Sequence, residues 1–336
     1  VQCILPLDGM SDYHCEWFRQ NSLQNLPEDS KMQSLRTAGW ITPMILGVIS
    51  ILSPVDAQET VPAGVVFEKN IEYSNPDDQH LQLNMARPKE GAGPFPAVIC
   101  IHGGGFRAGT RESFNGLCLQ LAERGYVAVT VSYRLAPKYQ FPAAVYDVKA
   151  AVRWMRANAE KYQIDPDRVG TTGGSAGGHL AQFLGVTSGV KKFDGDGGNA
   201  EYSSSVKCVV NFYGPSDFTK SYDASVDAKD VLPLFLGGNL QQQRRRHIES
   251  SPLYWVTPEA APTLFVHGTK DAYVAHEQAE WIVERMKAAD VEATLMTIED
   301  GDHGFRTSSP EVKEKIEKAR FEFFERHLKM APPVGQ

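Results

Sequence analysis

The sequence predicts an α/β fold, a mostly parallel sheet of eight strands with helices on both faces. Short apolar runs alternate with stretches of helical periodicity from about residue 65 to 330. Runs that are apolar throughout are typical of strands buried on both faces of a parallel sheet. A glycine cluster that holds a single serine, Gly173 to Gly177, stands between one such run and a helical pattern. The fold class follows from these two observations.

Two strands open the pattern, 65–73 and 80–87, joined by a turn-forming segment, and they are expected to be an antiparallel lead-in. The remaining strands are expected at 97–102, 126–131, 169–172, 206–213, 263–267 and 294–298. Helices are expected at 113–124, 143–162, directly after Ser175, and at 275–289 and 311–330. The segment 218–257 interrupts the rhythm, with Pro233, Pro252 and two short helical pieces, and Pro258 follows directly after it. It is expected to be a small insertion before the seventh strand, over the carboxyl edge of the sheet, where such segments shape substrate pockets.

Composition limits the possible functions. The chain has 336 residues, of which 42% are hydrophobic, enough for one large α/β domain. Its formal net charge is −7, and binding to nucleic acid or to an anionic membrane requires a positive face. We therefore expect neither as a partner.

The first 57 residues are expected to lie outside this domain. Residues 1–31 are polar and without sustained periodicity, and we interpret them as an upstream extension, with a disordered tail as the alternative. Residues 32–57 have the form of a signal peptide, with Met32, Arg36, an apolar run at 40–52 and small residues before Gln58. A membrane span would need about 20 apolar residues. The expected domain is therefore 58–336, and the expected location is secreted or periplasmic.

The sequence predicts no metal and no cofactor. After cleavage the chain would retain Cys100, Cys118 and Cys208, which are expected to be buried structural thiols. No pair of cysteines or histidines has the spacing of metal ligands. The segment 194–199 is rich in aspartate and glycine, but it lacks the distal glutamate of a calcium loop, so we expect a plain surface turn.

Ser175 is the candidate nucleophile. It lies in Gly173-Gly174-Ser175-Ala176-Gly177, after an apolar run and before a helical pattern. A tight turn from strand to helix exposes a serine hydroxyl, requires flanking glycines, and directs the first amides of the helix at the reacting oxygen. The alternative, a structural glycine turn, is weakened by this context.

Three further segments complete the candidate site. His102-Gly103-Gly104-Gly105-Phe106 follows the third strand, where glycine backbone can present amides to an oxyanion. Asp271 follows the strand after the insertion, and His303 follows the last strand. Serine, then acid, then histidine is the chain order of α/β-hydrolases. Asp217, which follows the preceding strand, remains the competing acid.

These motifs, together with Ser132-Tyr-Arg-Leu-Ala-Pro137 and Phe141-Pro-Ala-Ala144, resemble the α/β-hydrolase esterases of the hormone-sensitive-lipase type and the related bacterial acetyl-xylan and feruloyl esterases. The resemblance implies an oxyanion hole formed by Gly104, Gly105 and the amide of Ala176. In the lipase-type branch the residue before the serine is usually aspartate, whereas here it is Gly174. The following Gly177-Gly178-His179-Leu180 resembles the polysaccharide-esterase branch more closely, which argues against a lipase-like substrate.

The expected function is a secreted serine carboxylesterase acting on short acyl or feruloyl esters of plant polysaccharides such as acetylated xylan. The alternatives are a general short-chain esterase or lipase of small-molecule esters, and a catalytically silent carbohydrate-binding member of the fold. Three aromatic residues of the insertion, Phe235, Tyr254 and Trp255, are either a surface for sugar or phenolic groups or the core of a lid.

Overall fold

The sheet has eight strands in the order β1-β2-β4-β3-β5-β6-β7-β8 in the computed structural model, which describes residues 60–220 and 222–329. β2 pairs antiparallel with β1 and β4, and all other neighbours are parallel. The predicted fold class and the antiparallel lead-in are confirmed. The strands are β1 (Val65–Ser74), β2 (Leu81–Pro88), β3 (Phe95–Ile101), β4 (Val127–Val131), β5 (Ile164–Gly174), β6 (Cys208–Phe212), β7 (Thr263–Gly268) and β8 (Ala293–Ile298).

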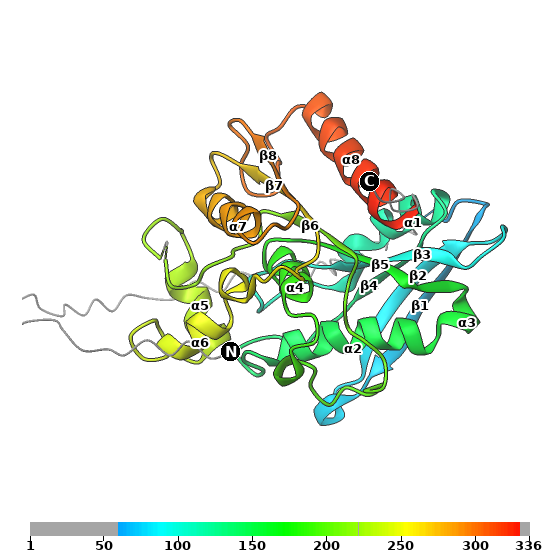
Figure 1. Cartoon of the computed structure of the whole chain (residues 1–336), viewed down its shortest axis with the longest axis horizontal. Helices are drawn as coiled ribbons and strands as arrows, with labels where there is room; N and C mark the ends of the chain where they lie inside the picture. The colour runs from blue at the N-terminus through cyan, green and yellow to red at the C-terminus, as the bar shows by residue number, and fades with distance from the viewer. Residues whose placement is uncertain (1–59, 221, 330–336) are drawn as a thin grey trace, which may run out of the picture. The chain divides into compact units, whose positions relative to one another are not determined.

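Helices cover both faces of the sheet (Figure 1), with α1 and α8 on one side and α2 on the other. The helices are α1 (Asn115–Glu123), α2 (Ala143–Ala157), α3 (Ala159–Tyr162), α4 (Ala176–Val186), α5 (Ala228–Leu236), α6 (Arg244–Glu249), α7 (Glu277–Ala288) and α8 (Pro310–Phe324). Alternation along the strands divides the core between the two faces. In β3, for example, Ile99 packs with the α2 side and Val98 with the α1 and α8 side.

Several element boundaries differ from the sequence expectation; the helix expected at 311–330, for example, is α-helical only from Pro310 to Phe324, and two further differences have a clear physical reason. The helix expected at 143–162 breaks at Asn158, where the backbone leaves helical geometry (φ −107°, ψ 17°) and the side-chain amide donates to the Trp154 carbonyl at 2.9 Å. An asparagine that satisfies a terminal carbonyl in this way favours the end of a helix. β5 also begins earlier than expected, because Ile164 pairs with Phe95 of β3.

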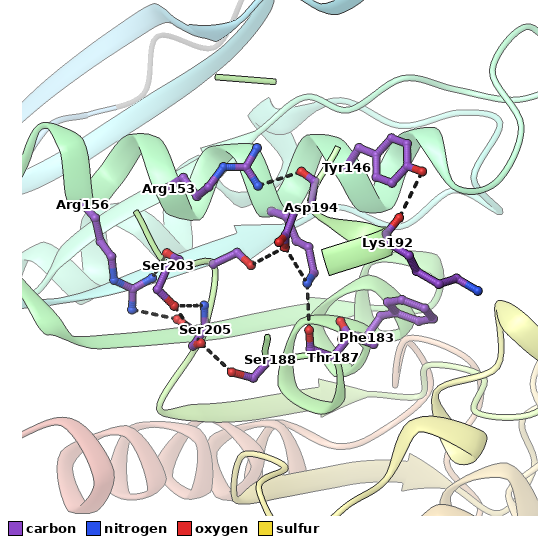
Figure 2. A network of polar contacts seen from close by, with 12 residues as sticks. Tyr146, Arg153, Arg156, Phe183, Thr187, Ser188, Lys192, Asp194, Ser203 and Ser205 are labelled. Carbon is purple, nitrogen blue, oxygen red and sulfur yellow. Dashed lines mark hydrogen bonds and ion pairs between the residues drawn. The ribbon is translucent and has the colours of Figure 1, made fainter. Parts of the chain in front are cut away.

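The loop between α4 and β6 is attached to α2 by buried basic side chains (Figure 2). Arg153 donates to the Asp194 carbonyl at 2.7 Å and to the Gly198 carbonyl at 2.9 Å. The Lys149 ammonium lies 3.3 Å from the Asp194 carboxylate and donates to the Thr187 carbonyl at 2.8 Å. A lysine thus supplies the cation for Asp194, and no metal-binding cluster occurs among the described residues. The loop is anchored on α2 more firmly than the expected plain surface turn.

The expected extension and signal peptide, 1–57, lie outside the described residues. Within residues 60–220 and 222–329, no helix is long and apolar enough to cross a membrane. Cys100, Cys118 and Cys208 are all buried, as expected of structural thiols. The insertion contributes α5 and α6 between β6 and β7, as expected.

Candidate active site

Ser175 lies in a sharp turn between β5 and α4. Its backbone has φ 57° and ψ −123°, a conformation that costs a non-glycine residue free energy and is typical of functional positions. Hydrogen bonds hold the turn on both sides, from the Ser175 amide to the Phe212 carbonyl at 2.9 Å and from the His179 amide to the Ser175 carbonyl at 2.9 Å. A Cβ on Gly177 would lie 2.0 Å from the Ile101 carbonyl oxygen, so only glycine lets α4 approach β3 this closely.

Backbone amides converge near the serine. The loop after β3 has positive φ at Gly104 (114°) and Gly105 (58°), and both residues line the same cavity as Ser175. Ala176 begins α4, where the first amides of a helix have no acceptor within the helix. Among the described residues, the amides of Gly104, Gly105 and Ala176 donate no hydrogen bond. All three are therefore available to an oxygen that carries developing negative charge.

Asp271 and His303 form a hydrogen-bonded pair. The loops after β7 and β8 bring His303 Nδ1 to 2.7 Å from Asp271 Oδ2. Burial by itself raises the pKa of Asp271, but hydrogen bonds from His267 and His303 outweigh it and hold this pKa well below its ordinary value. The amides of Tyr273 and Val274 also donate to Asp271 Oδ1, each at 2.9 Å. The carboxylate is therefore ionised and fixed in position.

The competing acid, Asp217, has other partners. Its carboxylate accepts from the Thr219 amide at 2.8 Å, from the Thr219 hydroxyl at 2.6 Å and from the Tyr254 hydroxyl at 3.2 Å. Lys220 forms an ion pair with it at 3.6 Å. Asp217 thus orders the start of the insertion, whereas Asp271 contacts the histidine.

His179 and His267 have structural roles. His179 is fully buried, donates through Nδ1 to the Pro215 carbonyl at 3.0 Å, and packs against the rings of Phe106 and Phe218. Burial lowers the pKa of His179 to about 4. His267 donates to the Val274 carbonyl at 2.8 Å and so orders the loop that carries Asp271.

A cavity of about 520 Å³ contains the candidate reacting groups. Ser175, His303 and the three candidate oxyanion residues line it. Among the described residues, no hydrogen bond yet joins the Ser175 hydroxyl to His303, a contact that often shortens only when substrate binds. The start of the insertion and α5 supply one wall of the cavity: Phe218, Lys220, Ser225, Asp227, Ala228, Val231 and Leu232.

The three aromatic residues singled out from the sequence of the insertion, Phe235, Tyr254 and Trp255, do not line this cavity, although one alternative had expected them to form a ligand surface. Phe235 is buried and stacks on Phe106 with ring centroids 3.9 Å apart. The Trp255 indole packs on Phe193, and neither it nor Tyr254 lines the cavity. Phe235 and Trp255 therefore belong to the core beneath the insertion.

Two tyrosines that sequence reasoning missed lie beside His303. The Tyr213 ring centroid is 4.6 Å from the imidazole centroid, and the Tyr273 centroid is 5.1 Å from it. Both residues line the cavity. Tyr273 is only two residues from Asp271 in sequence, which was the available signal, whereas Tyr213 follows the neighbouring strand β6.

The fold and this site geometry define an α/β-hydrolase. The BD-FAE family model matches residues 83–286, and the chain belongs to this family.

The chain also resembles named esterases. It is 32% identical to the probable carboxylic ester hydrolase LipM of Mycobacterium tuberculosis over 62% of this chain and 48% of LipM. A solved carbohydrate esterase from gut microbiota is 26% identical, with a TM-score of 0.69 over 79% of this chain and 97% of that chain. The propionate-bound esterase Est2 of Thermogutta terrifontis is 25% identical, with a TM-score of 0.65 over 80% of this chain and 97% of that chain. The chain spans about half the length of the curated relatives it matches.

Proposed function

We propose that this chain is a serine carboxylesterase in which Ser175 is the nucleophile, His303 the general base and acid, and Asp271 the residue that orients His303. The amides of Gly104, Gly105 and Ala176 are the proposed oxyanion hole. The observation that carries the proposal is the 2.7 Å contact from His303 Nδ1 to Asp271 Oδ2, with His303 in the same cavity as the strained Ser175. The esterases among the relatives support the same activity.

The reaction proceeds in two halves. Ser175 Oγ bonds to the ester carbonyl carbon while its proton passes to His303 Nε2, and the carbonyl oxygen becomes an oxyanion held by the three amides. The carbon–oxygen bond to the alcohol then breaks, and His303 returns the proton to the leaving oxygen. Water, deprotonated by His303, attacks the acyl-enzyme, and the acid leaves as Ser175 regains its proton. Asp271 stays ionised throughout and holds the imidazole tautomer.

The proposed substrates are short-chain acyl or feruloyl esters of carbohydrates, with acetylated xylan as the example. The apolar side chains of Val231 and Leu232 form a wall suited to an acyl group, while the cavity also holds polar groups. Est2 of T. terrifontis has been solved with propionate and with butyrate bound, and a carbohydrate esterase is a structural neighbour. We expect turnover to fall steeply beyond about eight acyl carbons, since long chains need an extended apolar channel.

The test is a panel of esters with acetyl, butyryl, octanoyl, dodecanoyl and feruloyl groups, on wild type and on Ser175→Ala. Hydrolysis of the short esters by wild type alone supports the proposal. If the wild-type protein hydrolyses none of these esters, the esterase proposal is wrong and the catalytically silent member of the fold becomes the better interpretation. Faster turnover of dodecanoyl than of acetyl esters would refute the short-chain preference.

We also propose that the protein is exported, from the signal-peptide pattern at 32–57. N-terminal mass spectrometry of protein from the periplasm or medium should find a chain beginning at Gln58 or within a few residues. Recovery of exported protein that retains 40–52 would contradict cleavage.

A further inference from the structure

The proposed mechanism fixes where the leaving alcohol must lie. His303 returns a proton to the alcohol oxygen, so the alcohol occupies the part of the cavity next to the imidazole. The rings of Tyr213 and Tyr273 are the aromatic neighbours of His303 there. Tyr213 is partly buried and also packs on Phe305 with centroids 5.2 Å apart. Tyr273 is 42% exposed, which makes it the ring that an incoming alcohol can contact.

Tyr273 is held in place by the loop that carries the acid. Its amide donates to Asp271 Oδ1 at 2.9 Å, and the next residue is anchored through the His267 contact to the Val274 carbonyl at 2.8 Å. The Val226 amide donates to the Ala272 carbonyl at 2.9 Å, so the insertion is joined to the same loop. Because the backbone on both sides of Tyr273 is fixed, ligand binding to its ring requires no further ordering of this loop.

The polar groups in the cavity differ in their pairing. Lys220 and Asp217 form an ion pair with each other at 3.6 Å. Arg107 and Asp227 also line the cavity, and within residues 60–220 and 222–329 neither forms an ion pair with another side chain. Among the described residues, the Asp227 carboxylate accepts one long contact, from the Ser225 hydroxyl at 3.5 Å. A guanidinium and a carboxylate are therefore available to donate to and accept from hydroxyl groups.

An exposed aromatic face combined with unpaired donors and acceptors fits a sugar ring better than an alkyl alcohol. The C–H groups on one face of a pyranose pack on an aromatic ring, and its hydroxyls satisfy charged side chains at the edge. An alkyl alcohol would desolvate Arg107 and Asp227 without replacing their hydrogen bonds with water.

We propose that Tyr273 is the stacking platform of an alcohol subsite that binds the sugar ring of the ester, with Arg107 and Asp227 contacting the sugar hydroxyls. This inference rests on the proposed esterase function and assigns the residue that sets its alcohol specificity.

The test compares two acetates that share an acyl group, ethyl acetate and a monoacetylated methyl xyloside. Tyr273→Ala should lower kcat/KM on the xyloside about tenfold more than on ethyl acetate, as expected for loss of one aromatic contact, and mainly through KM. Tyr273→Phe retains the ring and should restore the xyloside preference. Tyr254→Ala is the matched control, since Tyr254 is 47% exposed but outside the cavity, and it should leave the ratio unchanged.

The outcomes separate this inference from the proposed function. Equal losses on both acetates in Tyr273→Ala, or no loss on either, would overturn the sugar subsite while the esterase activity stands. Failure of wild type to hydrolyse either acetate would refute the esterase function itself. Two further variants, Arg107→Gln and Asp227→Asn, provide a second test, because each should raise KM for the xyloside more than for ethyl acetate. A thermal melt of every variant verifies that it is folded.

Discussion

A methyl group on Gly174 would lie 2.9 Å from the hydroxyl oxygen of Tyr213 and 3.2 Å from its ring. The residue before the nucleophile and the tyrosine after β6 therefore compete for one space. Burial raises the pKa of Tyr213, so its hydroxyl stays protonated. This contact gives a physical reason for glycine at the position where the lipase-type branch carries aspartate.

Gly174→Ala should therefore displace the Tyr213 ring and, with it, the His303 imidazole that it packs against. Misplacement of a catalytic group by about 1 Å costs roughly a hundredfold in rate, so we expect kcat to fall by ten- to a hundredfold with KM little changed. Gly116→Ala is the matched control, because nothing lies within 4 Å of a Cβ there. Equal kcat values in the two variants would contradict the steric account.

Asp271→Asn and Asp217→Asn should separate catalysis from stability. Loss of the carboxylate that orients His303 is expected to lower kcat by about 10⁴-fold. Asp217→Asn should stay within tenfold of wild type, since Asp217 contacts Thr219, Tyr254 and Lys220 and not His303, but it should melt at a lower temperature. Steady-state kinetics and melting curves measure both. A larger loss of kcat in Asp217→Asn would reverse the choice of acid.

Buried His179 should make stability depend on pH. Its pKa falls from 6.5 to about 4 in the folded protein, mainly through burial, so the unfolded chain binds a proton that the folded chain does not. The free energy of unfolding then decreases as pH falls between about 6.5 and 4, by about 2 kcal/mol from pH 7 to pH 5. Urea titrations at pH 7 and pH 5 should show that the free energy of unfolding differs less between these pH values in His179→Gln than in wild type.

His80→Gln serves as the control of opposite sign. The hydrogen bond with Glu72 raises the pKa of His80, so its contribution is present at low pH and lost as pH rises. The His80→Gln substitution should therefore not reduce the difference in the free energy of unfolding between pH 7 and pH 5. A His179→Gln protein with the same pH difference as wild type would contradict the assignment.

The anchor between α2 and the loop at 187–207 should support stability and not catalysis. Arg153→Met removes the donors to the Asp194 and Gly198 carbonyls and should cost about 3 kcal/mol in the free energy of unfolding. Because Arg153 does not line the cavity, kcat/KM at 25 °C should remain near wild type. Arg245→Met, at an 88% exposed side chain, should show no measurable loss. A fall in kcat/KM for Arg153→Met would link this loop to the site.

Much of the fold could be predicted from the sequence, because strands buried on both faces are apolar throughout and the motifs follow their carboxyl ends. The chain order of Ser175, Asp271 and His303 is likewise a sequence property. The sequence favoured Asp271 over Asp217 as the acid, but both follow strands at one edge, and only the loop geometry shows which of them contacts His303. The contacts of Tyr213 and Tyr273 with His303 join residues far apart in sequence, and only the position of Tyr273 beside Asp271 offered a local signal.

The insertion was the least predictable part. The sequence of the insertion does not show whether its aromatic residues face a ligand or the core. Phe235 faces the core because α5 packs its inner side on Phe106. The break at Asn158 likewise depends on a side chain that bonds to the backbone in place of continuing the helix.

Covalent labelling of Ser175 tests the central claim most directly. A fluorophosphonate added to the intact protein should bond to one serine, and mass spectrometry of the digest should place the added mass on the peptide that contains Ser175. His303→Ala should slow the labelling by several orders of magnitude, since the imidazole takes the serine proton. Stoichiometric labelling of wild type at Ser175, with none in Ser175→Ala, is the predicted result. Rapid labelling of another serine, or ester hydrolysis by Ser175→Ala at more than a hundredth of the wild-type rate, would contradict the account.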